Sequence, residues 1–316
     1  PAAQVRQPVN PAASQDPPRT TAAWIKAGSP GVWLTAGAVS FSLVMVFGLL
    51  FLITVRGMGH FWPAHVVQLS LAGAAEGENN ALGEIADEET VSATRLADAG
   101  VTVPAGKDVV HRVLLKVGNR NLYGFDFKWF NDVEIEAVTR PADVVVIERQ
   151  EWGNFYGFLA GLRSGEQTLD VSGDALRAEL DTRIAAAHEL RKAVADVEKH
   201  RMGAINYGLE QLRLGHRRLE LAGVHGGEPH AALDREAEVL KQRYEGLAKE
   251  LAELNRKAGA DVLLVKTANG HDSTIRVYDI VRVYAPNAMP FTAKLRQYFA
   301  KLGEFVATEP REANRP

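Results

Sequence analysis

The stretch VWLTAGAVSFSLVMVFGLLFLITV, Val32–Val55, decides the class of this protein. It is 24 residues long, and no charged residue lies between Lys26 and Arg56. As a helix it would be about 36 Å long, which is enough to cross a hydrocarbon layer of about 30 Å. A buried core helix is seldom uncharged on every face over such a length, and a cleaved signal peptide has a shorter apolar run. The stretch therefore predicts a transmembrane helix that persists as an anchor.

Aromatic residues flank this span, as they do at membrane interfaces. The expected interface residues are Trp24 and Trp33 at one end and Phe61 and Trp62 at the other. Arg19 and Lys26 precede the span, whereas only Arg56 follows it closely. Because cytoplasmic flanks are the more positive ones, the N-terminus is predicted to be cytoplasmic and residues after about 57 to lie outside the cytoplasm.

The composition excludes several classes of protein. The chain carries 36 Lys and Arg against 39 Asp and Glu, a formal net charge of −3, which excludes nucleic-acid binding driven by bulk charge. The absence of cysteine excludes disulfides and thiolate sites. The first residues are rich in Pro, Ala, Gln and Thr without apolar periodicity. Residues 1–23 are therefore predicted to form a disordered cytoplasmic tail, and residues 24–60 the transmembrane anchor.

Alternating apolar residues predict a β-rich region at residues 61–172. One expected face consists of Val109, Val113, Leu115 and Val117 and continues with Phe125, Phe127 and Trp129. Further strands are expected at 133–137 and 144–148, and together they predict a small sheet with one apolar face. His111 lies among these residues. A structural histidine is favoured over a metal ligand, because no second ligand lies at a suitable spacing.

The period changes to three and four residues over 173–258, which predicts an inserted antiparallel coiled-coil helical hairpin. The first arm runs from Asp174 to Ala222, and the loop VHGGEP, Val224–Pro229, turns the chain back. The predicted coiled-coil seam of the second arm is Leu233, Ala237, Leu240, Tyr244, Leu247, Leu251 and Leu254. Because Gly203, Gly208 and Gly215 weaken the first arm, a break or fraying is expected towards its tip.

Residues 259–288 are predicted to form a β-hairpin that completes the β domain, with a tight turn at Asn269-Gly270 and a strand over Ile275–Tyr284. Residues 289–316 follow as an amphipathic helix and linker. The apolar stripe of that helix comprises Phe291, Leu295, Tyr298, Leu302 and Phe305, flanked by Lys294, Arg296 and Lys301. Two places for the stripe stay open, the membrane surface and the soluble domain. The fold class expected for the whole chain is α+β and membrane-anchored.

The sequence contains none of the common catalytic motifs that we considered. His188-Glu189 lacks the second histidine of a zinc-protease helix, and there is neither a Walker phosphate loop nor a nucleophile elbow. His216, His225 and His230 gather near the loop of the helical hairpin. Solvated loop histidines are favoured there over an adventitious metal site. The chain is expected to be no enzyme and to carry no cofactor.

Three segments are distinctive: WIKAGSPGVWLTAGAV (Trp24–Val39), RGMGHFWP (Arg56–Pro63) and EPREAN (Glu309–Asn314). They resemble the PstA family, the permease subunit of bacterial phosphate ABC transporters, in a long form with a large domain between its first two membrane spans. The resemblance implies the bacterial inner membrane, with residues after about 57 in the periplasm. It implies as partners a second permease subunit, two cytoplasmic ATPase subunits and a periplasmic phosphate-binding protein.

In that family the chain continues beyond Pro316 into further spans, so the permeation residues are expected outside this sequence. The expected function is to anchor and present the periplasmic domain of a permease subunit for ATP-driven phosphate import, with ATP hydrolysis on the partner subunits. The alternative is a single-span periplasmic adaptor of the membrane-fusion type, although the paired lipoyl-like motifs usual in such adaptors are not seen beside the hairpin. A single-span sensor is a weaker third hypothesis.

Overall fold

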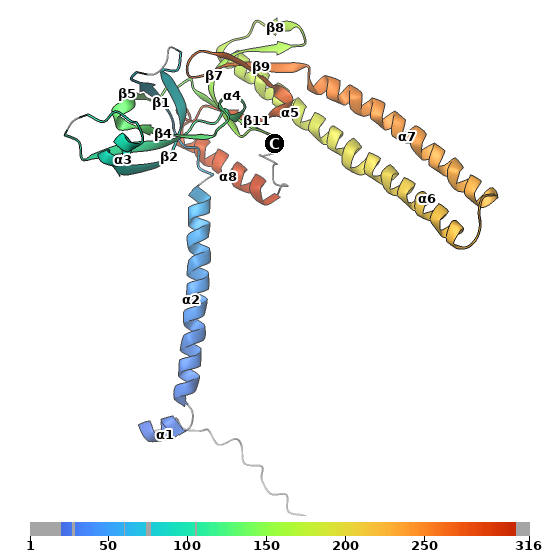
Figure 1. Cartoon of the computed structure of the whole chain (residues 1–316), viewed down its shortest axis with the longest axis horizontal. Coiled ribbons are helices and arrows are strands. Elements are labelled where there is room, and N and C mark those ends of the chain that lie inside the picture. The colour runs from blue at the N-terminus through green and yellow to red at the C-terminus, as the bar shows by residue number, and fades with distance from the viewer. Residues whose placement is uncertain (1–19, 27–28, 60, 74–76, 105, 308–316) are drawn as a thin grey trace, which may run out of the picture. The chain divides into compact units, whose positions relative to one another are not determined.

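The computed structural model describes residues 20–26, 29–59, 61–73, 77–104 and 106–307 (Figure 1). It confirms a mixture of helices and antiparallel sheets, divided into two compact units, Pro1–Trp62 and Pro63–Pro316. Most of the predicted tail and the EPREAN segment lie outside the described residues. Residues 21–23 belong to helix α1, Thr21–Lys26, so this end of the predicted tail is helical and not disordered.

Helix α2, Ser29–Gly59, contains the whole predicted span. Its 31 residues give a length of about 46 Å. Its apolar stretch has no buried residue, and the helix is long and apolar enough to cross a membrane. The Thr35 and Thr54 hydroxyls donate to backbone carbonyls one turn earlier, at 3.0 and 2.8 Å. These polar side chains are therefore satisfied within the helix itself.

The structure describes the side chains of three of the four predicted interface aromatics, Trp33, Phe61 and Trp62. Trp33 is exposed in the first turns of α2. Phe61 and Trp62 follow its last residue in a turn, in which their backbone N–H groups donate to Met58 and Gly59 carbonyls at 3.3 Å. The side chain of Trp24 lies outside the part of the chain that the structure describes.

The first sheet has five antiparallel strands in the order β4-β3-β2-β1-β5. The strands are β1 (Val66–Leu71), β2 (Asn80–Ser92), β3 (Val109–Lys116), β4 (Phe127–Asn131) and β5 (Ile135–Thr139). The short helices α3 (Ala93–Asp98) and α4 (Arg120–Tyr123) follow β2 and β3. The sequence pattern does not predict β1 and β2, because a run of exposed acidic residues interrupts the apolar alternation of β2.

The predicted apolar face of this sheet is wrong in part. Leu115 is buried as expected, but Val109 and Phe127 are exposed, and Val110 takes a core position. Val110 and Leu115 are five positions apart and therefore lie on opposite faces of β3. Different clusters bury them, Val110 with Val91 and Leu96, and Leu115 with Phe130.

The second sheet has the order β10-β9-β7-β6-β11, and β8 pairs with β7. Its strands are β6 (Val145–Arg149), β7 (Asn154–Ser164), β8 (Gln167–Leu169), β9 (Asp261–Lys266), β10 (Asp272–Arg276) and β11 (Ile280–Tyr284). The single strand expected over Ile275–Tyr284 is wrong. A 3-10 turn at Val277–Asp279, closed by an Arg276–Asp279 ion pair at 2.8 Å, breaks it and leads the chain to the opposite edge of the sheet.

Two further expectations for this region need correction. The hairpin of residues 259–288 completes the second sheet, whereas the strands expected at 109–137 belong to the first. At the Asn269-Gly270 turn only Gly270 has a positive φ, of 77°. A tight type I′ turn requires positive φ at both central residues, so the connection is a longer loop. The side chain of Asn269 instead forms hydrogen bonds with the backbone of Asn80.

Three asparagine side chains join the two sheets. Each accepts a hydrogen bond from the backbone N–H of one residue in the other sheet and donates one to the carbonyl of that same residue. The pairs are Asn119 with Tyr156, Asn269 with Asn80, and Asn287 with Val66, at 2.7–3.1 Å. Each side chain thereby supplies the hydrogen bonds that a neighbouring strand would supply, which leaves these backbone groups satisfied.

Helix α5, Gly173–Ala195, belongs to the core of the second sheet. Its residues Leu176, Leu180 and Ala187 are buried in one cluster with side chains of the strands. Arg191 also reaches the sheet, where it donates hydrogen bonds to the carbonyls of Tyr278 and Ile280. The region predicted as a separate hairpin from residue 173 therefore contributes its first helix to the core.

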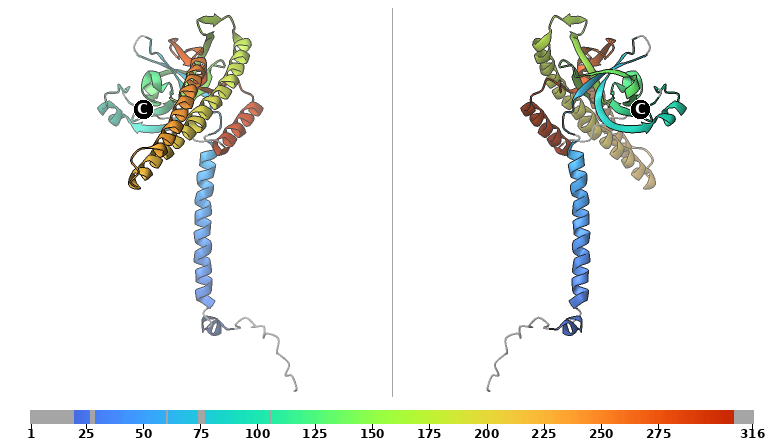
Figure 2. Two further views of the ribbon diagram at one scale, coloured as in Figure 1. Left: turned by 90° about the vertical axis from the view of Figure 1, so that its right-hand side faces the viewer. Right: turned by 90° about the vertical axis from the view of Figure 1, so that its left-hand side faces the viewer.

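The chain continues from α5 through a π-helical turn, Asp196–Met202, into α6, Gly203–Leu221, and returns along α7, Glu228–Ala258 (Figure 2). We call residues 196–258 the helical arm. Helix α6 runs unbroken through Gly208 and Gly215, so the break expected towards the tip is wrong, and the π-helical turn ends directly before Gly203. A Cβ at Gly208 or Gly215 would lie 3.0 or 3.2 Å from a leucine side chain of α7, so these glycines allow α7 to approach closely.

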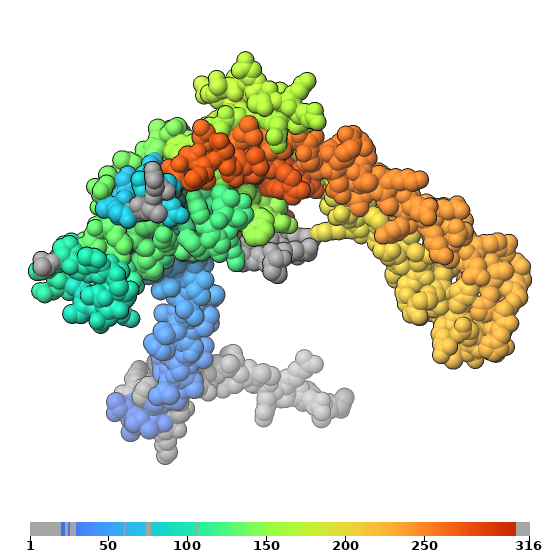
Figure 3. Space-filling model, turned by 45° about the horizontal axis from the view of Figure 1, so that its top comes forward, coloured from blue at the N-terminus to red at the C-terminus, as the bar shows by residue number. Residues whose placement is uncertain are grey.

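The predicted seam residues lie on α7, which runs beside α6 (Figure 3). Leu247 is buried in a cluster with Val197 and Ile205, and Tyr244 is exposed. The half-buried members of the seam are Leu233, Ala237, Leu240, Leu251 and Leu254.

Candidate functional site

Helix α8, Phe291–Ala307, is the element around which buried charged groups gather. Leu295 and Phe299 of its apolar face are exposed, whereas Lys294 and Gln297 are buried. The helix therefore packs on the domain through its polar side. The sequence left two places open for the predicted stripe, the membrane surface and the soluble domain. Only a small part of the stripe packs on the soluble domain, because Tyr298 and Leu302 are no more than half-buried.

Glu148, in β6, is the centre of the attachment of α8. Its side chain is 9% exposed and accepts from Lys301 Nζ at 2.6 Å and from Arg282 Nη1 at 3.3 Å. Arg282 also donates to Glu304 of α8, at 2.9 Å. Two carboxylates and two cations thus neutralise each other, and Glu148 is the most buried of the four. Such buried pairs are costly to break, because one charge is then left buried without its counter-charge.

A second attachment holds the start of α8. Lys294 Nζ donates to His65 Nε2, and His65 Nδ1 donates to Asn287 Oδ1, both at 3.3 Å. Asn287 in turn donates to the carbonyls of Val66 and Pro141. This pattern assigns the hydrogen of the His65 ring to Nδ1. Burial lowers the pKa of Lys294 from its ordinary value, which agrees with its place on the inner side of the helix.

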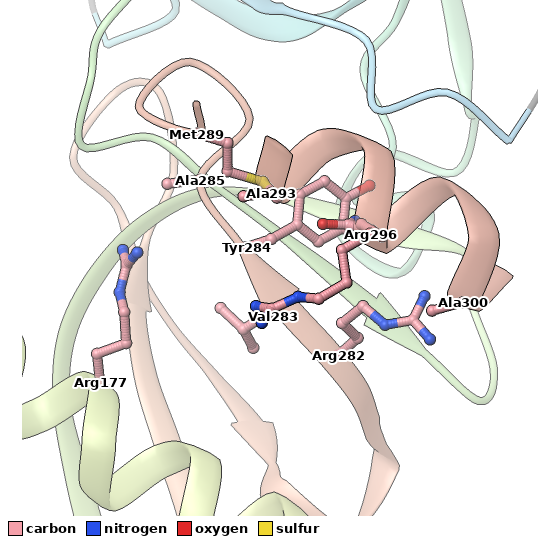
Figure 4. A pocket seen from close by; sticks show the side chains of 10 residues that line it. Arg177, Arg282, Val283, Tyr284, Ala285, Met289, Ala293, Arg296 and Ala300 are labelled. Carbon is pink, nitrogen blue, oxygen red and sulfur yellow. The ribbon is translucent and has the colours of Figure 1, made fainter. Parts of the chain in front are cut away.

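A hollow of about 380 Å³ lies beside this attachment, between α5, β11 and α8 (Figure 4). Arg177 from α5 and Arg296 from α8 stand on opposite sides of Val283, and Arg282 also lines the hollow. Among its ten lining residues there are three arginines and no carboxylate. Guanidinium groups bind carboxylates and phosphates. Because Arg282 already pairs with Glu148 and Glu304, Arg177 and Arg296 are the two groups that give this hollow the chemistry to hold a small anion.

Two buried tyrosines lie next to these charges. Burial raises the pKa of the Tyr156 phenol well above its ordinary value of 10.0, and the charge of Glu84 adds to the shift. Burial likewise raises the pKa of the Tyr284 phenol, with contributions from Glu148 and Glu84. Both phenols therefore stay neutral in the folded chain.

We expect the folded chain to lose stability above about pH 10 as a result. The unfolded chain then releases the phenol protons and the folded chain keeps them, so the free energy of unfolding falls by up to about 1.4 kcal/mol per pH unit for each tyrosine. Guanidinium unfolding of the detergent-solubilised chain at about pH 8 to 11 measures the slope. Tyr156→Phe and Tyr284→Phe should each remove the contribution of one tyrosine to this pH dependence of the free energy of unfolding. A phenylalanine variant with an unchanged slope would mean that its tyrosine ionises in the folded state.

The predicted histidine cluster is only partly assembled. His216 and His230 face each other with their Nδ1 atoms 2.7 Å apart. His216 Nε2 lies 3.2 Å from Asp234, and His230 Nε2 lies 3.1 Å from the Val224 carbonyl. Both outer nitrogens thus face oxygens that can accept a hydrogen bond.

Two other candidate histidines, His111 and His225, lie on the surface of the chain. His225 is exposed in the loop of the arm. His111 is exposed as well, with Nδ1 2.9 Å from the Thr90 hydroxyl. Within residues 20–26, 29–59, 61–73, 77–104 and 106–307, no group of three or more histidine, aspartate or glutamate residues has an arrangement that could hold a metal ion.

The sequence does not identify the Glu148 attachment. Its one signal is the carboxylate that closes the otherwise apolar run VVVIE, Val144–Glu148, because a charged residue in a buried strand needs a counter-charge. The partners Arg282 and Lys301 lie in other elements, and no local spacing connects them to Glu148.

Comparison of the chain with protein-family models found no matching family, and comparisons with curated proteins and with solved structures found no significant match.

Proposed function

We propose that this chain is the N-terminal anchor and periplasmic domain of an inner-membrane permease subunit for ATP-driven phosphate import. Helix α2 carries the anchor part of the proposal. Its stretch Val32–Val55 has no charge and no buried residue, and a separate folded unit begins at Pro63. Exposed apolar side chains over this length are stable in lipid and unfavourable in water. Arg19 and Lys26, ahead of the span, favour a cytoplasmic N-terminus.

The phosphate-import part rests on the resemblance of three segments to the PstA family, Trp24–Val39, Arg56–Pro63 and Glu309–Asn314. The partners are then a second permease subunit, two ATPase subunits and a periplasmic phosphate-binding protein. ATP hydrolysis takes place on the ATPase subunits, so this chain acts without catalysis or a cofactor of its own.

We assign the docking of a partner protein to the helical arm, in the form of an antiparallel coiled-coil hairpin. Helix α7 has 31 residues and a length of about 46 Å. The buried cluster at the base of the helical arm contains Val197 and Leu247. The surface further along the arm carries exposed ion pairs such as Arg213–Glu210. A long surface with charged side chains supports recognition of another protein through complementary charges.

A shortened arm in the source cell tests this role. Residues 204–221 and 228–247 are removed, so that the native loop 222–227 joins Gly203 to Ala248. Removal of the whole region 174–258 is unsuitable, because it would take buried leucines of α5 from the core. The ion pair between Arg201 and Glu250, at 2.6 Å, stays in place and keeps the remaining helices in register.

We expect the shortened chain to reach the membrane in normal amounts. It should bind the phosphate-binding protein or the partner permease at least about tenfold more weakly, which corresponds to about 1.4 kcal/mol, and phosphate uptake should fall with it. His225→Ser, which changes the loop and keeps the length of the arm, is the control. Unchanged association and unchanged uptake would count against the docking role.

The second candidate function is a single-span periplasmic adaptor of the membrane-fusion type. The observation that favours it is the position of the arm, because the strands on either side of it, β8 and β9, both pair with β7. An adaptor would co-purify with an outer-membrane channel and an export pump. Co-purification with a second permease subunit and ATPase subunits would instead support phosphate import.

A further inference from the structure

Helix α8 presents an apolar face to its surroundings. Phe299 is 60% exposed and Val306 79% exposed, and Leu295 lies on the same face. The α-helical repeat brings these residues into one stripe together with Phe291 and Phe305, which are 67% and 70% exposed. Single exposed apolar side chains are common on soluble proteins, but a stripe of five large ones marks a surface that contacts something other than water.

The rotation of α8 about its axis is determined by its polar side. Lys301 and Glu304 pair with Glu148 and Arg282 of the second sheet, and Lys294 donates to His65. Leu295, Phe299 and Val306 of the apolar stripe lie on the opposite side of the helix from these contacts. They cannot turn towards the domain unless the buried ion pairs break.

The chain itself indicates what covers the stripe. Only residues 60–64 separate the end of α2 from His65, and an extended segment of six steps reaches at most about 20 Å. His65 contacts both Lys294 and Asn287, so the start of α8 is tied to the point at which the chain would leave a bilayer.

The composition of α8 also fits a lipid surface. Its sequence FTAKLRQYFAKLGEFVA contains three basic residues, of which Lys294 and Lys301 bind the domain and Arg296 is exposed. A row of exposed aromatic and aliphatic residues beside an exposed basic residue is typical of helices that lie in a membrane interface.

We propose that α8 lies in the interface of the membrane that holds α2, with Leu295, Phe299 and Val306 among the acyl chains. The inference rests on the proposed anchor role of α2. Helix α8 then gives the domain a second contact with the bilayer, and two contacts restrict the directions in which the helical arm can point. The ion pairs around Glu148 transmit this restriction from α8 to the second sheet.

Spin labels on the full chain test the proposal, and the chain has no cysteine that would interfere. Single-cysteine variants Leu295→Cys and Phe299→Cys place a nitroxide on the apolar stripe, and Ala300→Cys places one on the other side of α8. Phe47→Cys reports on α2. All four residues are exposed, so no core side chain is removed, and the melting temperature of each labelled chain checks this. The purified chain is reconstituted alone into vesicles of phosphatidylethanolamine and phosphatidylglycerol.

Collision rates with oxygen, which concentrates in lipid, and with a water-soluble nickel chelate give the depth of each label. We expect the labels at 295 and 299 to lie about 5–10 Å below the headgroup boundary, and the label at 300 to lie in water. Labels at 295 and 299 in water, with the label at 47 in lipid, would overturn this inference and leave the anchor intact. Labels at 295 and 299 shielded from both reagents would also overturn it, because a second copy of the chain would then cover the stripe. A label at 47 in water would refute the anchor and this inference with it.

Discussion

Asn119→Ala is expected to lower the free energy of unfolding by about 3–6 kcal/mol, a large share of the total for an ordinary domain. The Asn119 side chain is 2% exposed, and it bonds both the N–H and the carbonyl of Tyr156, at 2.8 and 3.1 Å. Removal of the amide leaves these two buried backbone groups without those hydrogen bonds. Alanine is also strained at the φ of 52° that Asn119 adopts.

Guanidinium unfolding of the detergent-solubilised chain, followed by tryptophan fluorescence, measures the loss. Asn119→Gly removes the same hydrogen bonds and relieves the backbone strain, so it should be about 1 kcal/mol more stable than the alanine variant. Asn206→Ala is the matched control, since Asn206 is exposed on α6, and its effect should stay within about 0.5 kcal/mol. A loss below about 1 kcal/mol for Asn119→Ala would show that water replaces the two hydrogen bonds between Asn119 and the backbone of Tyr156.

Glu148→Ala is expected to destabilise the chain by about 3–5 kcal/mol and to loosen helix α8. Lys301, whose side chain is 17% exposed, loses its carboxylate partner but keeps its charge. Arg282 retains only its contact with Glu304 among these ion pairs. Unfolding free energies measure the total effect, and faster hydrogen exchange of the α8 amides would locate it.

Two further variants separate charge from packing at this site. The double variant Glu148→Met with Lys301→Met replaces the pair by apolar side chains, and it should recover most of the stability that Glu148→Ala loses. Glu250→Ala breaks the exposed pair with Arg201 in the helical arm and should leave the melting temperature almost unchanged. Equal effects of Glu148→Ala and Glu250→Ala would contradict the central role of Glu148.

Local patterns in the sequence were sufficient for the elements whose structure depends on their own residues. The uncharged stretch Val32–Val55 predicts α2 without reference to the rest of the chain, because a helix satisfies its backbone groups internally. The regular spacing of leucines over 233–254 likewise predicts α7. The alternation at 109–117 and 144–148 finds strands β3 and β6, although not the face of β3 that is buried.

The division into two sheets was decided by contacts between distant residues. Asn287 and Val66 are 221 residues apart, and Asn269 and Asn80 are 189 apart, so no local period connects them. The 3-10 turn at Val277–Asp279 sends β11 to β6, and this pairing depends on a strand that lies far earlier in the chain. A sequence pattern specifies which residues alternate, whereas the partner of each strand edge depends on the whole fold.

The direction of α8 shows the same limit at the candidate site. The stripe of apolar residues predicts an amphipathic helix, but the same stripe fits a protein core and a membrane surface equally well. The choice depends on Glu148, Arg282 and His65, which bind the polar side of the helix and leave the apolar side exposed. Helix formation is a local property of the chain, and the direction in which a helix face points is determined by the charges that the folded domain places beside it.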